Sequence, residues 1–301
     1  MMKKINDIIG DAKTIGIAGH VRPDGDCMGS CMSLYNYLKK NRPDLDVRVF
    51  LEFVDKKFNI IENTDQIITT GYDGTKFDLF ISLDTASLDR LGLNLPFYEN
   101  AKRTACIDHH ASNDGYADYN YILPKASSAS EVLYDLLDED LIDKSIAEPM
   151  YMGIAHDSGV FRFQSTTPKT MRIAANMIEK GVNVNMILEE TFFRKTYNQM
   201  MVTAKIQSEA VLALDGKCIY GYCTSEMMEE YGVTTKDLDA VVASIRNVDG
   251  VEVAMFLYQL SENSYKVSLR SKNYVDVSKI AVENGGGGHV RAAGAEIHGE
   301  L

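Results

Sequence analysis

The sequence lacks several features that would assign it to a common class of protein. Its five cysteines are odd in number and contain no CxxC pair, so neither a disulfide framework nor a zinc ribbon is indicated. No apolar run approaches the roughly 20 residues that span a bilayer, and the first residues, MMKKINDIIGDAK, do not contain the apolar core of a secretory signal. We therefore expect a cytoplasmic protein without a membrane role.

Positive charge is also scarce, because 31 Lys and Arg residues stand against 43 Asp and Glu residues, for a formal net charge of −12. Proteins that bind long duplex DNA or RNA need a basic face, so duplex DNA is not an expected partner. A small anionic ligand bound locally remains compatible with this charge. So do metal cations, which would offset clustered carboxylates.

The chain has 301 residues, enough for two domains, and its pattern changes near residue 185. In residues 1–185, β-prone runs at 14–19, 46–52, 77–84 and 103–110 are separated by enough chain for crossover helices. This βαβ pattern predicts an α/β domain with a mostly parallel sheet and helices on both faces. Residues 186–209 contain neither Gly nor Pro and predict a helical connector. Residues 210–301 are β-rich with one helix at 275–285, which predicts a smaller mixed α/β domain.

Aspartate and histidine residues gather where the predicted strands of the first domain end. These positions are His20, Asp24, Asp26, Asp84, Asp108, His109 and His110, with His156 and Asp157 at the end of a predicted helix. In an open parallel sheet the carboxyl ends of the strands form one edge, where ligands bind. Each segment alone has an ordinary explanation: HVRPDGD is a good turn, and Asp84 could cap a helix. Four such segments together predict a site.

The donor atoms at this edge are both carboxylate oxygens and imidazole nitrogens. This mixture suits Mn²⁺, Fe²⁺, Co²⁺ or Zn²⁺, whereas oxygen ligands alone would suit Mg²⁺ or Ca²⁺. The set is larger than one ion needs, and two ions about 3.5 to 4 Å apart with a bridging carboxylate would use it fully. We expect two divalent ions, with Mn²⁺ as the first choice and Mg²⁺ or Co²⁺ as alternatives. Such a pair activates a bridging water for hydrolysis of a phosphate ester.

Four segments of the chain resemble the successive motifs of the DHH phosphoesterases: HVRPDGDCMGS, DLFISLD, CIDHHASN and MYMGIAHDSGVFRF. The segment VSLRSKNYVDVSKIAVENGGGGHVRAAGAEI resembles the C-terminal DHH-associated domain. The resemblance spans nearly the whole chain. It is strongest to the nanoRNase branch, whose members are bifunctional oligoribonucleases and 3'-phosphoadenosine 5'-phosphate (pAp) phosphatases.

The resemblance also implies roles for individual residues of the first domain. One ion would be held by His20, Asp24 and Asp84, and the other by Asp26, Asp84, His109 and Asp157, with Asp84 bridging. Asp108 would orient a histidine ligand. His110 would lie beside the scissile phosphate as a hydrogen-bond donor or general acid, and His156 would be structural. The roles of Arg22, Ser112 and Asn113 stay open.

The second domain carries a glycine run, Gly285 to Gly288, followed by His289 and Arg291. Glycines let backbone N–H groups approach an anion closely, although a flexible turn is the simpler alternative. The resemblance implies that Arg270 and His289 bind a substrate phosphate, and that Gly286, Gly287 and Gly288 hold the nucleotide end. Arg291 and Lys272 are candidates for the same anion, with a solvated surface charge as the alternative.

The expected substrates are short single-stranded oligoribonucleotides, including dinucleotides such as pApA, or pAp. A cyclic-di-AMP phosphodiesterase is the alternative. Inorganic pyrophosphatase or polyphosphatase activity is more distant, because the glycine run counts against it. A nucleotide-binding module without catalysis is disfavoured by the complete set of ligands. The sequence does not rank the nucleotides, and it leaves a homodimer open.

Overall fold

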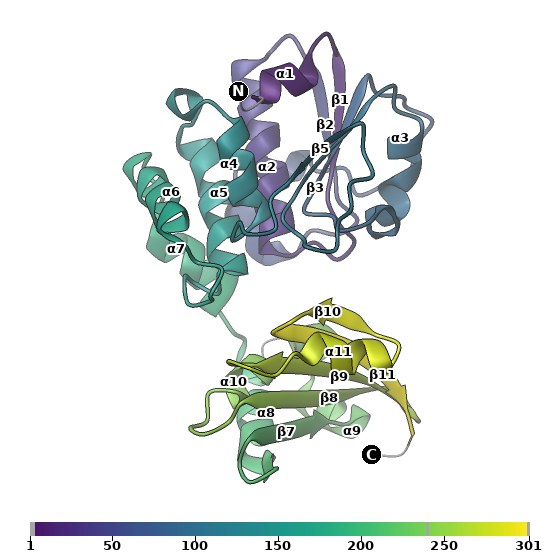
Figure 1. The fold of residues 1–301 in the computed structure, drawn as a ribbon, viewed down its shortest axis with the longest axis vertical. Helices are drawn as coiled ribbons and strands as arrows, with labels where there is room; N and C mark the ends of the chain where they lie inside the picture. Colours follow the sequence, from purple (N-terminus) through teal and green to yellow (C-terminus); the bar gives the residue numbers. More distant parts are fainter. Residues whose placement is uncertain (1–3, 239–240, 300–301) are drawn as a thin grey trace. The chain divides into compact units, whose positions relative to one another are not determined.

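The computed structural model describes residues 4–238 and 241–299, and contacts between Cα atoms divide the chain into two compact units, Met1–Arg194 and Lys195–Leu301 (Figure 1). Within the described residues, every helix is too short or too polar to traverse a lipid bilayer.

The first unit is built on a five-stranded sheet in which every pair of neighbouring strands is parallel. In the order β2-β1-β3-β4-β5, its strands are Asp46–Phe50, Thr14–Ala18, Leu79–Leu83, Thr104–Asp108 and Tyr119–Ile122. The parallel sheet predicted from the βαβ pattern is confirmed. Strand β5 was not predicted, because YNYI is short, half-buried and without an alternating apolar pattern.

Helices cover both faces of this sheet (Figure 1). On one side lie α2 (Gly25–Asn41), α4 (Ala129–Leu136) and α5 (Lys144–Asp157), and on the other lies α3 (Leu95–Glu99). Strand β3 shows why both faces are covered, since all five of its residues are buried. Leu79 and Ile81 belong to one apolar core, and Phe80 belongs to a second core with Phe97. A parallel strand buried on both faces reads as a continuous apolar run.

Further short helices surround the first unit: α1 (Ile5–Ile9), α6 (Pro168–Glu179) and α7 (Val184–Leu188). The π-helical turn η5 (Glu189–Phe193) follows α7 directly, and residues 194–196 are not helical. Helix α8 (Tyr197–Glu209) then begins at a capping box formed by Thr196 and Gln199. The segment for which the sequence predicts one helical connector therefore consists of two helical pieces on either side of residues 194–196.

The second unit contains a six-stranded mixed sheet in the order β10-β11-β9-β8-β7-β6. In that order the strands are Gly287–His289, Ala292–His298, Ser264–Ser271, Val253–Ser261, Cys218–Cys223 and Val211–Ala213. Only the β7–β8 pair among them is parallel. This unit has two apolar cores. Helices α8, α9 (Ser225–Tyr231) and α10 (Val241–Ile245) contribute residues to one of them, and α11 (Val277–Glu283) contributes residues to the second.

Helices α2 and α5 pass very close to each other in the first unit. A Cβ atom at Gly29 would lie 2.5 Å from the Pro149 carbonyl oxygen and 2.8 Å from the Gly153 backbone, so only glycine fits. Pro149 lies inside α5 and has no N–H for the Ser145 carbonyl one turn earlier. The Asn36 side chain of α2 donates to that carbonyl instead, at 2.8 Å. Asp143 caps the start of α5, because its side chain accepts from the Ile146 amide.

The Asn36→Ala substitution tests this replacement bond. We expect the free energy of unfolding to fall by about 1–3 kcal/mol, because the partly buried Ser145 carbonyl loses its donor. Urea unfolding measures this change, and Asn41→Ala is the control, since the Asn41 amide donates to Leu141 at the exposed end of the same helix. Equal, small decreases in the free energy of unfolding for both substitutions would show that the Asn36 hydrogen bond does not stabilise the fold more than an exposed one.

Candidate active site

The HVRPDGD segment joins β1 to α2 and begins one side of the site. The Asp24 side chain caps α2: its Oδ1 accepts from the Asp26 and Cys27 amides at 3.0 and 3.1 Å. Its other oxygen, Oδ2, lies 3.7 Å from His20 Nε2. His20 Nδ1 donates to the Val21 carbonyl at 2.8 Å, which turns Nε2 toward the carboxylates. The Asp24 side chain is 61% exposed, so the site is open to solvent on this side.

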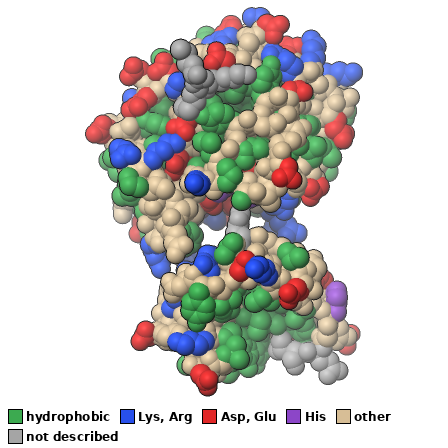
Figure 2. All heavy atoms as spheres, viewed as in Figure 1, with side chains coloured by type: hydrophobic (Ala, Val, Ile, Leu, Met, Phe, Trp, Pro, Cys, Tyr) green, Lys and Arg blue, Asp and Glu red, His purple; other side chains and the backbone are tan. Residues whose placement is uncertain are grey.

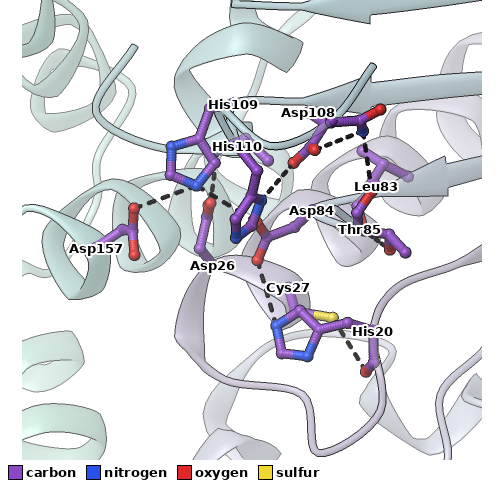
Figure 3. A network of polar contacts seen from close by, with 12 residues as sticks. His20, Asp26, Cys27, Leu83, Asp84, Thr85, Asp108, His109, His110 and Asp157 are labelled. Carbon is purple, nitrogen blue, oxygen red and sulfur yellow. Dashed lines mark hydrogen bonds and ion pairs between the residues drawn. The ribbon is translucent and has the colours of Figure 1, made fainter. Parts of the chain in front are cut away.

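Asp84 occupies the centre of the site at the carboxyl end of β3, where its side chain is only 4% exposed (Figure 3). Its Oδ2 lies 3.5 Å from His20 Nε2, and its Oδ1 lies 3.5 Å from His109 Nε2. Asp84 also has a positive φ of 51°, which is uncommon for a residue other than glycine and is typical of functional sites. One carboxylate thus faces two histidines with two different oxygens.

A second group lies around His109 and combines residues from β4, α2 and α5 (Figure 3). His109 Nε2 is 3.4 Å from Asp157 Oδ2, at the end of α5. Asp26 is buried and accepts hydrogen bonds from the start of α4: from the Ala129 amide at 2.6 Å and from the Ser130 amide and hydroxyl at 3.0 and 2.6 Å. These bonds fix the Asp26 carboxylate at a helix N-terminus, which favours its charged form.

Within the described residues, three groups have ligand atoms that all lie within 4.8 Å of one another. They are His20 with Asp24 and Asp84, Asp26 with His109 and Asp157, and Asp84 with His109 and His110. Asp84 Oδ1 is buried and accepts no hydrogen bond from the described residues, as expected of an atom suited to a metal. The acid and histidine residues predicted from the strand ends therefore come together, and as oxygen and nitrogen donors they could hold divalent cations.

The charges in this group shift one another's pKa. Burial alone would raise the pKa of Asp84, yet its contacts with His109 and His20 hold it well below the usual aspartate range. Burial alone would lower the pKa of His109, but the neighbouring carboxylates of Asp84 and Asp157 raise it to about 10. Burial, followed by repulsion from Asp84, raises the pKa of Asp26 to about 7. Positive charge therefore stabilises this group of carboxylates, and protons or divalent cations can supply it.

Asp108 contacts one of the two histidines that follow it. Its Oδ1 lies 2.8 Å from His110 Nδ1 (Figure 3), so the histidine that it orients is His110 rather than His109. Asp108 thus orients the histidine assigned to the substrate.

Asn113, whose role the sequence left open, is buried behind this pair. Its amide donates to Asp108 Oδ2 at 2.7 Å and to the Thr85 carbonyl at 3.1 Å. Because Thr85 follows Asp84 directly, Asn113 connects the ends of β3 and β4, and so the two segments that carry Asp84 and His109. The sequence did not predict this contact, because no pattern marks an asparagine five residues after Asp108 as its hydrogen-bond donor.

His156 lies outside the three groups, in agreement with a structural role. Its Nε2 is 2.8 Å from the Thr191 hydroxyl, and its ring packs against Phe58 and Phe192. Burial, followed by the positive charge of Lys57, lowers its pKa to about 4, so the ring is neutral at pH 7. A Cβ at Gly25 would lie 2.1 Å from this ring, which explains the glycine within HVRPDGD.

In the second unit, backbone pairing places two predicted positions, His289 and Arg270, in one row across the sheet. His289 of β10 pairs with Ala292 of β11, which pairs with Arg270 of β9. The glycine run is not a free loop: Cβ atoms at Gly286 and Gly288 would lie 2.1 and 2.6 Å from carbonyl oxygens of β11, so both are needed for close packing. Gly287 has open space where its Cβ would be. The His289 side chain lies outside the part of the chain that the structure describes.

Comparison with known proteins agrees with this geometry. Residues 14–154 match the N-terminal domain of the DHH family, and residues 215–301 match the DHHA1 domain. A Thermus thermophilus protein, the bifunctional oligoribonuclease and PAP phosphatase NrnA, is 32% identical, and the match covers 95% of this chain and 84% of that protein. The chain belongs to the DHH family.

Two further proteins are similar to this chain over most of its length. A Bacillus subtilis protein with the same name is 27% identical over 95% of this chain and 90% of its own length. The crystal structure of an exopolyphosphatase-related protein from Bacteroides fragilis superposes with a TM-score of 0.90 at 24% identity, covering 99% of this chain and 91% of that one. This last likeness confirms the fold.

Asn113→Ala tests whether this amide positions His110. We expect kcat to fall about 10- to 100-fold, as for other groups that orient an active-site residue, with KM and bound metal unchanged. In a His110→Ala background the same substitution should have no further effect on kcat, because its target is gone. Asn120→Ala is the control, since Asn120 bonds only within its own turn. Additive losses of kcat in the double variant would show that Asn113 acts independently of His110 and would contradict the positioning role.

Proposed function

We propose that this chain is a two-metal phosphoesterase that hydrolyses short oligoribonucleotides, such as pApA, and pAp. As a member of the DHH family it is a hydrolase of the phosphoesterase type. The observation that carries the proposal is the position of Asp84, whose two oxygens face separate groups of ligand atoms. The names of the T. thermophilus and B. subtilis relatives support the choice of substrate.

The two groups of donors suggest how the ions are held. We assign His20, Asp24 and Asp84 to one ion, and Asp26, Asp84, His109 and Asp157 to the other. Mn²⁺ is the proposed metal, because carboxylate and imidazole donors are mixed, with Mg²⁺ or Co²⁺ as alternatives. When bound, two such ions supply a water of lowered pKa and neutralise the phosphoryl oxygens.

The remaining residues position the substrate and the leaving group. His110, held by Asp108, would donate a hydrogen bond or a proton to the oxygen that leaves the phosphate. Asn113 keeps Asp108 in place for this step. The open side of the site beside Asp24 would admit the substrate.

The second unit would bind the end of the substrate that is not cleaved. Arg270, His289 and the backbone of Gly286, Gly287 and Gly288 are the proposed phosphate ligands, and the cross-strand row of Arg270 and His289 supports this. Figure 2 shows acidic and basic side chains interspersed over the face that it displays, which suits a small substrate better than a duplex. Such substrates arise from RNA turnover, so we propose that the protein acts in the cytoplasm.

A panel of substrates tests the proposed activity. The Mn²⁺-loaded protein should hydrolyse pApA and pAp faster than a long single-stranded RNA, cyclic-di-AMP or pyrophosphate. Faster turnover of cyclic-di-AMP than of pApA would identify a cyclic dinucleotide phosphodiesterase instead. Turnover of pyrophosphate alone would contradict the nuclease assignment, and binding without turnover of any substrate would indicate a binding module.

Asp84→Ala should remove both metal binding and activity, because one residue serves both ions. We expect kcat to fall roughly a thousandfold or more, equivalent to about 4 kcal/mol of transition-state stabilisation, and calorimetric titration with Mn²⁺ to lose both sites. The matched control is Asp89→Ala, an exposed aspartate in the segment that follows Asp84. A variant that still binds two ions would contradict the bridging role.

Arg270→Ala should weaken substrate binding without affecting chemistry at the metals. The KM for pApA should rise about tenfold or more, the cost of one charge-assisted hydrogen bond, while hydrolysis of bis-p-nitrophenyl phosphate stays unchanged. Lys266→Ala is the control, because Lys266 lies on the same strand four residues away. Equal losses on both substrates would remove Arg270 from the phosphate-binding role.

A further inference from the structure

We infer that the second unit holds a nucleobase on the ring of Tyr274, at a pocket separate from the metal groups. The inference rests on the proposed function, because it assumes that the substrate is a nucleotide. It adds a site for the base, which neither the motifs nor the metal groups provide.

The pocket lies at the edge of the sheet where β7 and β8 begin and β9 ends. It has a volume of about 280 Å³, and its lining includes Lys217, Glu252, Lys272, Asn273 and Tyr274. Lys217, Lys272 and Tyr274 line this hollow together with two acidic residues, Asp249 and Glu252, and the Glu252 carboxylate is already occupied by backbone amides. Proteins that bind single nucleotides and single strands place cations and aromatic rings together.

The loop that carries Tyr274 is held rigidly by a buried carboxylate. Glu252 is only 4% exposed, and its Oε1 accepts from the backbone amides of Asn273, Tyr274 and Val275 at 2.9, 2.7 and 3.0 Å. Burial alone would raise the pKa of Glu252, but these amides hold it below its usual value, so the carboxylate stays charged. Three consecutive amides are therefore fixed from one side.

Arg291 holds the same loop from its carbonyl side. Its guanidinium donates to the Val275 carbonyl at 2.7 Å and also to the Asn273 carbonyl. The sequence offered Arg291 as an anion ligand or a solvated charge, and the structure instead shows it fastening the loop. The Ser271 hydroxyl adds a further bond to Val275 at 2.7 Å. The loop is thus ordered by this chain alone, and a ligand would not have to order it on binding.

The Tyr274 side chain is exposed although its backbone is fixed on both sides. It is 68% exposed, so it contributes little to the apolar core. An exposed ring on a rigid frame offers a base a stacking surface at small entropic cost. Lys272, whose ammonium donates to the Val248 carbonyl at 2.9 Å, lines the same pocket as Tyr274.

The loop also continues directly from the proposed phosphate ligand. Arg270 is the penultimate residue of β9, and Tyr274 follows it by four residues. The Ser271 amide donates to the Arg291 carbonyl at 3.1 Å, which ties this strand end to the turn after His289. One continuous segment, residues 270–274, would therefore bind both the phosphate, through Arg270, and the base, through Tyr274.

The test uses a dinucleotide that contains 2-aminopurine, whose fluorescence is quenched by stacking. It is bound to the full chain in EDTA, so that no hydrolysis occurs. Wild type and Tyr274→Phe should quench the fluorophore, whereas Tyr274→Ala and Tyr274→Leu should bind about tenfold or more weakly with little quenching, the loss of one stacked base. Tyr222→Ala is the control, an exposed tyrosine of the same unit.

Two results would overturn the inference: no quenching by wild type, or equal quenching and affinity for the Phe, Ala and Leu variants. The thermal unfolding midpoint of each variant shows that the loop is intact, since Glu252 binds only the backbone of residue 274. A separate assay tests the proposed function. If the wild-type protein with Mn²⁺ does not hydrolyse the dinucleotide, the proposed function fails, regardless of the fluorescence measured in EDTA.

Discussion

Repulsion among carboxylates at the end of the parallel sheet is the constraint on which the rest of the structure depends. Asp24, Asp26, Asp84 and Asp157 come close enough to raise one another's pKa, and Asp26 and Asp84 are buried. Like charges in a region of low dielectric are costly unless cations or hydrogen-bond donors balance them. The chain supplies donors at two helix starts, with the first amides of α2 on Asp24 and those of α4 on Asp26. Histidines supply positive charge, and metal ions would supply more.

The scaffold of the first unit serves this arrangement. Asp26 lies on α2 and Asp157 ends α5, so their approach depends on how closely the two helices cross. Gly29 and Gly153 allow that crossing, and a Cβ at Gly153 would lie 2.7 Å from Asp26 Oδ1. Pro149 at the same crossing has no N–H to donate within α5, and the Asn36 side chain of α2 replaces that hydrogen bond. A substitution far from the metal ligands can thus disturb the site by separating these helices.

Sequence reasoning reached the fold and the main acidic site because both depend on local patterns. Apolar runs followed by Asp or His marked the strand ends, and the geometry of a parallel sheet brought those ends together. Contacts between distant segments left no such pattern. The hydrogen bond from Asn113 to Asp108 depends on how the turn after β4 folds back. The hydrogen bonds of Glu252 and Arg291 to the backbone of residues 273–275 join segments about twenty residues apart. Strands β5 and β10 escaped prediction because they are short and contain few apolar residues.

The most direct test of the account is a crystal structure of the Mn²⁺-loaded protein with anomalous diffraction measured at the manganese edge. The account predicts two anomalous peaks about 3.5 to 4 Å apart, one beside His20 and Asp24 and the other beside Asp26, His109 and Asp157, with Asp84 bound to both. A single peak, or two peaks that do not share Asp84, would contradict it.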